Sequence, residues 1–226
     1  MAKVNPQDIE AARQENLQAT VSKTDQFFKE NAKLLWTVAG VAAVVILAIV
    51  GYVKFIYQPK CAEAMESCYP ADQAFAAGEF ELALNGDGNV LGYEAVIDEY
   101  GKKAGKAVYF AAGVCELQLG NYEEALSYLK KYNVKEPVLA AKALGCQGDA
   151  FVGLENYDAA VACFEKAASV DDNMLAAAYL VKAGAVYEKL GKAAKAVGCY
   201  KKVKDQYPQS IEAYDIDKYI TRAEAE

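Results

Sequence analysis

The sequence predicts an all-α protein, in which an N-terminal transmembrane helix precedes a superhelix of about three to four stacked helical hairpins and a capping helix. A six-residue segment at 120–125 recurs at 155–160 and 191–196, at offsets of 35 and 36 residues. A glycine precedes each copy at matched spacing, and a Leu or an aromatic residue follows it. Repeats of this length are typical of stacked hairpins, because a single hairpin cannot bury its apolar face alone.

The composition fits a folded helical domain with an anchor. The 226 residues include only five prolines and sixteen glycines, which disfavours a disordered chain. The net charge is −7, and the residues after 60 hold 26 acidic and 17 basic side chains. This balance disfavours nucleic-acid binding, because a phosphate backbone requires a basic patch.

Histidine is absent from the chain. Its absence removes the commonest general base and metal ligand, and it excludes Ser–His and Cys–His catalytic pairs. No set of clustered carboxylates stands out in the sequence either. We therefore expect no enzyme activity, no catalytic residue, no cofactor and no metal.

Residues 1–33 are expected to form a cytoplasmic tail, and residues 34–57 a transmembrane helix. No charged residue occurs from Leu34 to Val53, and a helix of this length spans roughly the 30 Å hydrocarbon core of a bilayer. Trp36 near one end, with Tyr52 and Tyr57 near the other, fits the interfacial positions of aromatic residues. A cleaved signal peptide fits less well, because 33 residues precede a long apolar run. A buried core helix is the third alternative.

The lysines flanking this segment favour one orientation. Lys23, Lys29 and Lys33 precede it, whereas Lys54 and Lys60 follow it. Because basic residues are enriched on the cytoplasmic side, the N-terminus is expected inside and the C-terminal domain outside the cytoplasm.

Residues 58–226 are expected to form the repeat domain, with units at 70–105, 106–140, 141–176 and 177–210 and a capping helix at 211–226. Gly113, Gly148 and Gly184 lie inside first helices, where glycine costs about 1 kcal/mol relative to alanine. We interpret them as sites where two helix backbones approach too closely for a β-carbon. Pro137 and Pro208 are expected to follow the ends of second helices.

The first unit is irregular. Phe75 and Phe80 are expected to face a group of later apolar residues in the same unit, namely Tyr93, Ile97 and Tyr100. The connection of its hairpin is expected to be enlarged by residues 85–89. Asn85, Asp87 and Asn89 resemble the start of a calcium loop, but valines stand where that loop needs Gly and a bidentate Glu. An Asx turn is therefore the better prediction.

The pattern of small and aromatic residues, the turn Gly-x-Tyr-x-x-Ala and the following proline resemble tetratricopeptide repeats over residues 106 to about 210. The layout as a whole resembles the YfgM-like periplasmic tetratricopeptide proteins, in particular those of Bacteroidota. Segments that carry this second resemblance are DQFFKEN at 25–31, LNGDGNVLGYEAVIDEYG at 84–101 and IDKYI at 216–220. It implies a single-pass protein of the bacterial inner membrane with periplasmic repeats. The partners it implies are Sec-translocon subunits, periplasmic chaperones and exported client proteins.

The concave surface of such a superhelix is the expected site for a partner or peptide, and it is lined by first-helix residues. The candidates are Phe110, Val114, Leu117, Asp149, Val152, Val181, Ala185 and Glu188. Their mixture of apolar and acidic side chains suits a peptide with apolar and some basic residues. The alternative is that these residues only cover each other or the closing helix. Recognition of an acidic C-terminal tail is not expected, because Phe110, Val114, Gly145 and Cys146 stand where relatives with that activity carry polar groups.

Six cysteines occur without a C-x-x-C motif. Cys61 and Cys68 would lie about 10 Å apart along a helix, too far for a disulfide. The cysteines are expected to be small buried apolar residues, although reduced cysteines are unusual outside the cytoplasm.

Taken together, these features predict a non-catalytic, membrane-anchored adaptor that serves the Sec translocon or periplasmic chaperones. An envelope scaffold that coordinates cell division or cell-wall synthesis is the alternative. The oligomeric state is left open.

Overall fold

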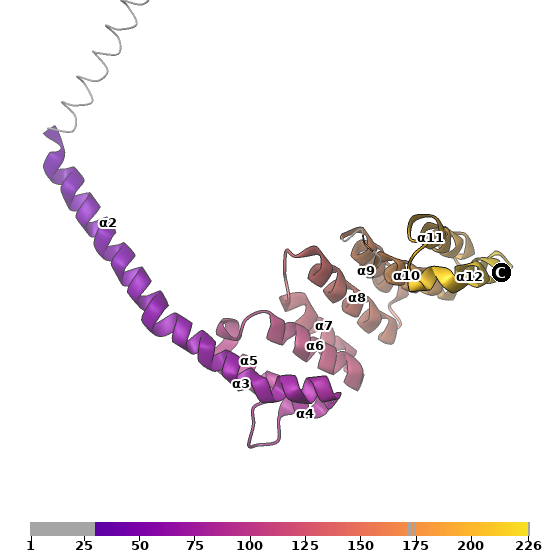
Figure 1. The fold of residues 1–226 in the computed structure, drawn as a ribbon, viewed down its shortest axis with the longest axis horizontal. Coiled ribbons are helices and arrows are strands. Elements are labelled where there is room, and N and C mark those ends of the chain that lie inside the picture. The colour runs from indigo at the N-terminus through magenta and orange to yellow at the C-terminus, as the bar shows by residue number, and fades with distance from the viewer. Residues whose placement is uncertain (1–29, 171–172, 174, 226) are drawn as a thin grey trace, which may run out of the picture. The chain divides into compact units, whose positions relative to one another are not determined.

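The computed structural model describes residues 30–170, 173 and 175–225, and the chain divides into two compact units, Met1–Gln58 and Pro59–Glu226 (Figure 1). Within Met1–Gln58, helix α2 spans Ala32–Tyr52 and continues through a π-helical turn, η1, at Val53–Tyr57. None of its side chains is buried, and Leu47 is 70% exposed. The predicted tail lies outside the described residues apart from 30–33.

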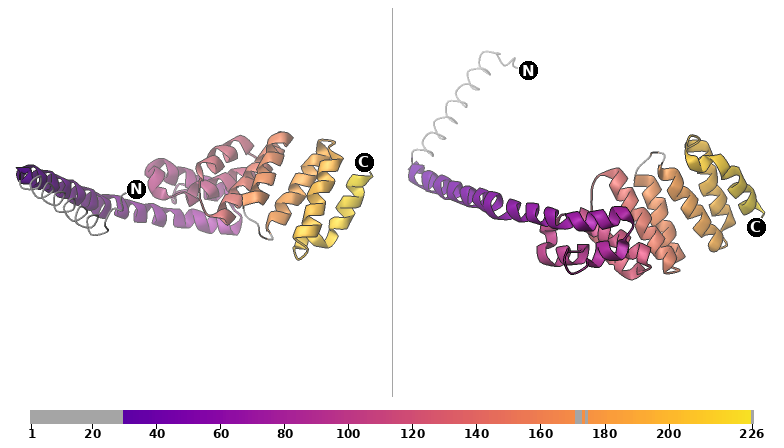
Figure 2. Two further views of the ribbon diagram at one scale, coloured as in Figure 1. Left: turned by 90° about the horizontal axis from the view of Figure 1, so that it is seen from above. Right: turned by 60° about the horizontal axis from the view of Figure 1, so that its bottom comes forward.

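Pro59–Glu226 consists of helical hairpins followed by a closing helix. Its elements are α3 (Gln58–Ala77, which begins one residue earlier), α4 (Phe80–Asn85), α5 (Tyr93–Tyr100), η2 (Gly101–Ala104), α6 (Ala107–Leu119), α7 (Tyr122–Lys131), α8 (Pro137–Gly153), α9 (Tyr157–Val170), α10 (Leu175–Lys189), α11 (Ala193–Gln206), η3 (Ile211–Asp215) and α12 (Ile216–Glu224). Helices α6 and α7, α8 and α9, and α10 and α11 pack as pairs, and α12 packs on α11. Figure 2 shows these helices side by side in chain order. The described residues contain no β-strand, which agrees with the predicted all-α class.

The hairpins share one turn geometry, which occurs four times. Gly78, Gly120, Glu155 and Gly191 each adopt a positive φ, between 56° and 83°. The amide of the next residue donates to a carbonyl five residues earlier, in the pairs Glu79–Ala74, Asn121–Glu116, Asn156–Phe151 and Lys192–Tyr187, at 2.8–2.9 Å. This Schellman arrangement satisfies the last carbonyls of a helix and needs a left-handed residue, which explains the glycines of the repeated motif.

The first hairpin corrects one sequence prediction. Its connection is the short turn at Gly78 and Glu79, and not the loop at residues 85–89. The loop instead divides the second helix into α4 and α5. Tyr93 lies 15 residues after Gly78, whereas Phe164 lies nine after Glu155, so the loop inserts six residues between equivalent positions. The segment 78–83 is thus a fourth copy of the repeated motif, ending in the fully buried Ala83.

Gly148 and Gly184 inside first helices accommodate side chains, so the interpretation of a close backbone approach was wrong at these two positions. A β-carbon on Gly148 would lie 2.5 Å from Cε1 of Phe164, and one on Gly184 would lie 2.3 Å from Cε1 of Tyr200. The second helix of each hairpin therefore places a bulky side chain over a bare patch of the first. A β-carbon on Gly113 would lie 2.7 Å from Cγ of Leu129 and 3.1 Å from its backbone nitrogen, so the predicted close approach of the backbone is found at this position.

Proline has a different role from the predicted one at the start of α8. Helix α7 ends at Lys131, and Pro137 is the first residue of α8, where its missing amide costs no hydrogen bond. The side chain of Glu136 caps this helix by accepting from the amides of Val138 and Leu139. At the other end of the domain, α12 buries Ile216, Ile220 and Ala223 in the cluster formed with α10 and α11, so it closes the stack as predicted.

The predicted contact of Phe75 with Tyr93 is confirmed, and Ile97 and Tyr100 pack against the same apolar cluster. The rings of Phe75 and Phe80 lie 5.8 Å apart, and those of Phe75 and Tyr93 lie 6.3 Å apart. The Tyr93 side chain is 1% exposed, and its hydroxyl donates to Asp72 at 2.6 Å. The irregular unit shares its apolar core with α6, since the same cluster includes Val108, Ala112 and Cys115.

Candidate protein-binding surfaces

The predicted concave residues lie on the first helices α6, α8 and α10, but several of them are packed. Phe110 and Leu117 lie against the cluster of Ala125, Leu126, Leu129 and Ala150, and the Phe110 ring lies 5.0 Å from that of Tyr132. Val181 packs against the cluster around Tyr200, and Val114 is half-buried. Val152 and Ala185 are exposed. The first helices thus offer a smaller apolar surface than the sequence pattern indicated.

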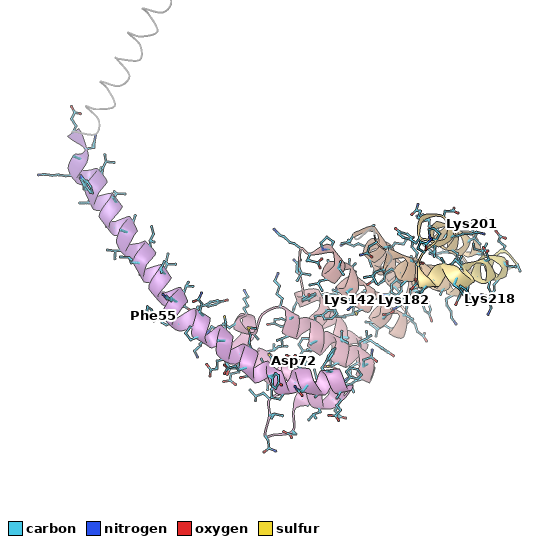
Figure 3. The ribbon with its side chains drawn as sticks, in the orientation of Figure 1. Phe55, Asp72, Lys142, Lys182, Lys201 and Lys218 are labelled. Atoms are coloured by element: carbon cyan, nitrogen blue, oxygen red, sulfur yellow. The ribbon has the colours of Figure 1, made fainter. Side chains whose placement is uncertain are left out.

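The two acidic members of the predicted set are paired with basic residues, one in the next hairpin and one in the closing helix. Asp149 in α8 accepts from Nζ of Lys182 in α10 at 2.7 Å. Glu188 in α10 accepts from both Nε and Nη2 of Arg222 in the closing helix, at 3.1 and 2.6 Å. Glu188 therefore fits the alternative in which a candidate residue contacts the closing helix. Figure 3 shows Lys142 and Lys182 extending from α8 and α10.

These pairs belong to a series of links between successive hairpins. A carboxylate in one hairpin meets a donor 33 or 34 residues later in Asp149–Lys182, Asp158–Lys192, Glu188–Arg222 and Glu94–Tyr128. Where both side chains are exposed, as in Asp158–Lys192, the link contributes little energy by itself. Their common spacing places each pair between one repeat and the next.

A depression that the sequence analysis missed lies at the edge of the domain where hairpin turns meet. It has a volume of about 690 Å³ and is lined by Gly78, Glu79, Phe80, Glu81, Leu82, Asn85, Gly86 and Leu119. We call it the edge depression. The signal that could have revealed it is the segment Gly78-Glu79-Phe80-Glu81-Leu82-Ala83, which matches the repeated turn, with Ala71 in the place of Gly113.

A second depression, of about 550 Å³, lies between α9, α10 and α11. Its lining combines Glu165 and Lys202 with Ser169, Gln206 and Tyr207. Glu165 already accepts a hydrogen bond from the hydroxyl of Tyr187 at 2.7 Å. The charges of this lining are mixed, so it does not select one sign of partner.

Half of the cysteines are buried in the packing of the domain, and the other half are partly exposed. All six are free thiols, and Cys68, Cys115 and Cys199 are buried. Burial raises the pKa of the Cys115 thiol to about 12 and the pKa values of Cys68, Cys146 and Cys199 to about 11. These four thiols are protonated at neutral pH and are therefore weak nucleophiles.

The loop that interrupts the first unit contains the predicted Asx turn. Asp87 Oδ1 accepts from the amides of Asn89 and Val90, at 2.9 and 3.0 Å. These backbone bonds lower the pKa of the Asp87 carboxyl. Gly86 and Leu91 form an antiparallel bridge at the base of the loop. Within residues 30–170, 173 and 175–225, no three acidic or cysteine side chains are grouped so that they could hold a metal ion.

Helix α2, with its continuation, meets the length and apolarity of a membrane span. The continuous helical stretch from Ala32 to Ala77 is the one described helix that does so, and none of its most apolar window is buried. Length and composition alone support this assignment. A signal sequence close to an N-terminus meets the same criteria.

Comparisons with known proteins identify the repeat. The tetratricopeptide repeat model matches residues 93–135 and 147–211. A crystal structure of MamA is similar with a TM-score of 0.52 and 22% identity, covering 69% of this chain and 92% of MamA. Another MamA crystal structure has a TM-score of 0.53 and 21% identity, covering 74% of this chain and 87% of that one. At this identity the likeness shows the fold alone. No curated protein matches the chain. The helices within residues 93–135 and 147–211 therefore match the tetratricopeptide repeat.

Proposed function

We propose that this protein is a non-catalytic adaptor, anchored by α2 in the bacterial inner membrane, whose tetratricopeptide repeats bind other proteins in the periplasm. Its most specific form is an ancillary factor of the Sec translocon or of periplasmic chaperones that handle exported chains. The proposal rests on two features of one chain. The stacked repeats leave apolar side chains exposed, and the apolar helix α2 has no buried side chain.

Helix α2 supports the membrane anchor through its exposed side chains. Trp36 is 79% exposed and Val44 is 67% exposed, with no polar face between them. A continuous apolar surface of this kind is unfavourable in water and stable in a bilayer. Anchoring would hold the repeats near membrane partners, so that a modest affinity suffices.

The repeat domain supports protein binding through its architecture. Stacked hairpins expose long surfaces while each hairpin is stabilised mainly by its neighbours. Of the predicted concave residues, Val152 and Ala185 remain exposed, and both are apolar. We keep the whole predicted concave set as a proposed contact surface for partners, with its acidic members acting once their ion pairs open.

Cross-linking in cells followed by purification of the full chain in mild detergent tests the proposal. Sec subunits or periplasmic chaperones are expected to co-purify with the protein. Cell-wall synthesis or division enzymes in their place would favour the alternative envelope scaffold. Recovery of no protein partner at all would contradict the adaptor function.

A reporter active only outside the cytoplasm, fused after the last residue, tests the topology. Activity is expected, and a silent reporter would reverse the proposed orientation. The anchor itself is tested by Val44→Arg against the control Val44→Leu. A charge at the centre of a span costs roughly 2.5–3.5 kcal/mol, so only the Arg variant should leave the membrane fraction.

A further inference from the structure

The edge depression has an apolar floor that no described element covers. Phe80 and Leu82 from α4 and Leu119 from the end of α6 line it, and Leu119 is 39% exposed. Val90 and Leu91, in the loop that begins at Gly86, are also exposed, at 38% and 37%. Such a group of apolar side chains is the kind of surface that partners cover.

The rim of the edge depression carries one sign of charge. Glu79 and Glu81 line it, and its lining includes no basic residue. Among the described residues neither of the two glutamates forms an ion pair. At the equivalent turn of a later hairpin, by contrast, Asp158 is paired with Lys192 at 3.0 Å.

The charge of this rim extends over the whole first unit. Residues 61–100 contain nine acidic side chains and no lysine or arginine, whereas residues 101–226 contain 17 of each sign. The net negative charge of the repeat domain therefore resides in the unit that contributes most of the edge depression. Of the nine acidic side chains, Asp72 accepts a hydrogen bond from the Tyr93 hydroxyl, and Glu94 accepts one from the Tyr128 hydroxyl.

These observations select one occupant. We propose that the edge depression is a docking site for a partner polypeptide segment that carries lysine or arginine beside apolar side chains. The apolar residues of the segment would cover Phe80, Leu82 and Leu119, and its bases would pair with Glu79 and Glu81. The inference rests on the proposed protein-binding function and names the chemistry of the partner.

Other occupants complement the site less well. The first 33 residues of the chain hold five basic and five acidic side chains, so they carry no net charge to match it. Nucleic acid and anionic lipid carry the same sign of charge as the rim. A second copy of the chain carries lysine clusters at 102–106, 130–135 and 201–204, but these lie within residues 101–226, whose 17 basic and 17 acidic side chains leave no net charge to match the rim.

Binding of a labelled synthetic peptide of alternating lysine and leucine to the full chain in neutral detergent tests the site. We expect this peptide to bind, and its glutamate–leucine counterpart not to bind. The double variant Glu79→Gln and Glu81→Gln should weaken binding roughly three- to tenfold, with a smaller effect at high salt. Leu119→Ser should weaken it by roughly tenfold at any salt concentration.

Glu123→Gln is the matched control, because Glu123 occupies in α7 the position that Glu81 occupies in α4 and does not line the depression. It should change the affinity by less than about twofold. Thermal unfolding followed by circular dichroism should give the same midpoint for all variants except Leu119→Ser. Equal affinity of the double variant and the wild type, or no binding of the lysine–leucine peptide, would overturn the proposal.

Two further measurements separate this inference from the proposed function. If sedimentation shows self-association that the double variant abolishes, the occupant is a second copy and the partner-segment proposal is wrong. If cross-linked partners co-purify with the double variant as well as with the wild type, the adaptor function stands and the docking site fails. Partners recovered with the wild type and lost with the double variant would support both.

Discussion

The ring of Phe164 in α9 occupies the space beside Gly148 in α8, so that a β-carbon on Gly148 would lie 2.5 Å from its Cε1. Gly184 and Tyr200 repeat this relationship one hairpin later. The contact is the unit of packing inside each hairpin, because the Phe164 and Tyr200 side chains are 1% and 0% exposed. The glycine on the first helix leaves the space that the aromatic ring of the second helix fills.

Replacement of Gly148 by alanine should therefore destabilise the domain, although alanine favours a helix. Overpacking of a well-packed site costs roughly 1–3 kcal/mol, which exceeds the gain in helix propensity. Chemical denaturation followed by circular dichroism measures the difference. Gly198→Ala in α11 is the control, because no atom lies within 4 Å of its β-carbon position. That variant should be more stable than the wild type by roughly 0.5–1 kcal/mol. Stabilisation by both variants would contradict the packing argument.

Glu155 is the one described non-glycine residue with a positive φ, at 56°. It stands at the turn position that glycine holds in the other three hairpins, and its left-handed conformation is strained by the β-carbon. Glu155→Gly should raise the free energy of unfolding by about 1 kcal/mol. The reverse change at Gly120, to alanine at a φ of 83°, should lower it by a similar amount. Opposite signs for the two variants in thermal melts are the expected result, and equal signs would count against it.

The pair Glu188–Arg222 should contribute more to stability than the other links between hairpins. The Glu188 side chain is 13% exposed and accepts two bonds from Arg222 and one from the Tyr200 hydroxyl at 3.2 Å. A double-mutant cycle on this pair should give a coupling of about 1 kcal/mol or more. The exposed pair Lys192–Asp158 should give roughly 0–0.5 kcal/mol. Equal couplings would show that the closing helix is held by its apolar residues alone.

Glu116 should make the stability of the domain depend on pH. Its side chain is 4% exposed, and burial raises the pKa of its carboxyl, against the opposing effect of a bond from Asn121 at 2.8 Å. Because the folded state then binds the proton more readily than the unfolded state, stability decreases as pH rises from the unfolded pKa through the folded pKa. Glu116→Gln should remove this dependence and stabilise the domain modestly at neutral pH. Unfolding midpoints measured across mildly acidic pH check it, and parallel curves for the two proteins would refute it.

The repeats could be predicted from the sequence because each hairpin is specified locally. The motif at 120–125 encodes a helix end, a left-handed residue and the start of the next helix within six residues. Gly113, Gly148 and Gly184 each lie at a fixed spacing before the bulky residue that packs against them. The fold class and the order of the hairpins follow from such short-range signals.

The first unit was predicted less well, because its signal is interrupted. The motif at 78–83 was hidden by alanine at position 71 and by the six-residue insertion before Tyr93. A loop inside a helix and a loop between helices have the same composition, and what distinguishes them is the hairpin turn at Gly78, with its positive φ and the bond from Glu79 to Ala74.

By itself, the sequence determined the helical class, the number of regular repeats, the apolar stretch and the distribution of charge, since each depends on residues close together in the chain. Tertiary structure alone decided which candidate residues remain exposed. Phe110 and Leu117 are covered by the next helix, Glu188 is held by Arg222 of α12, and Leu119 meets the turn of the preceding hairpin. Exposure is set by neighbours tens of residues away, and their approach depends on how the whole stack packs.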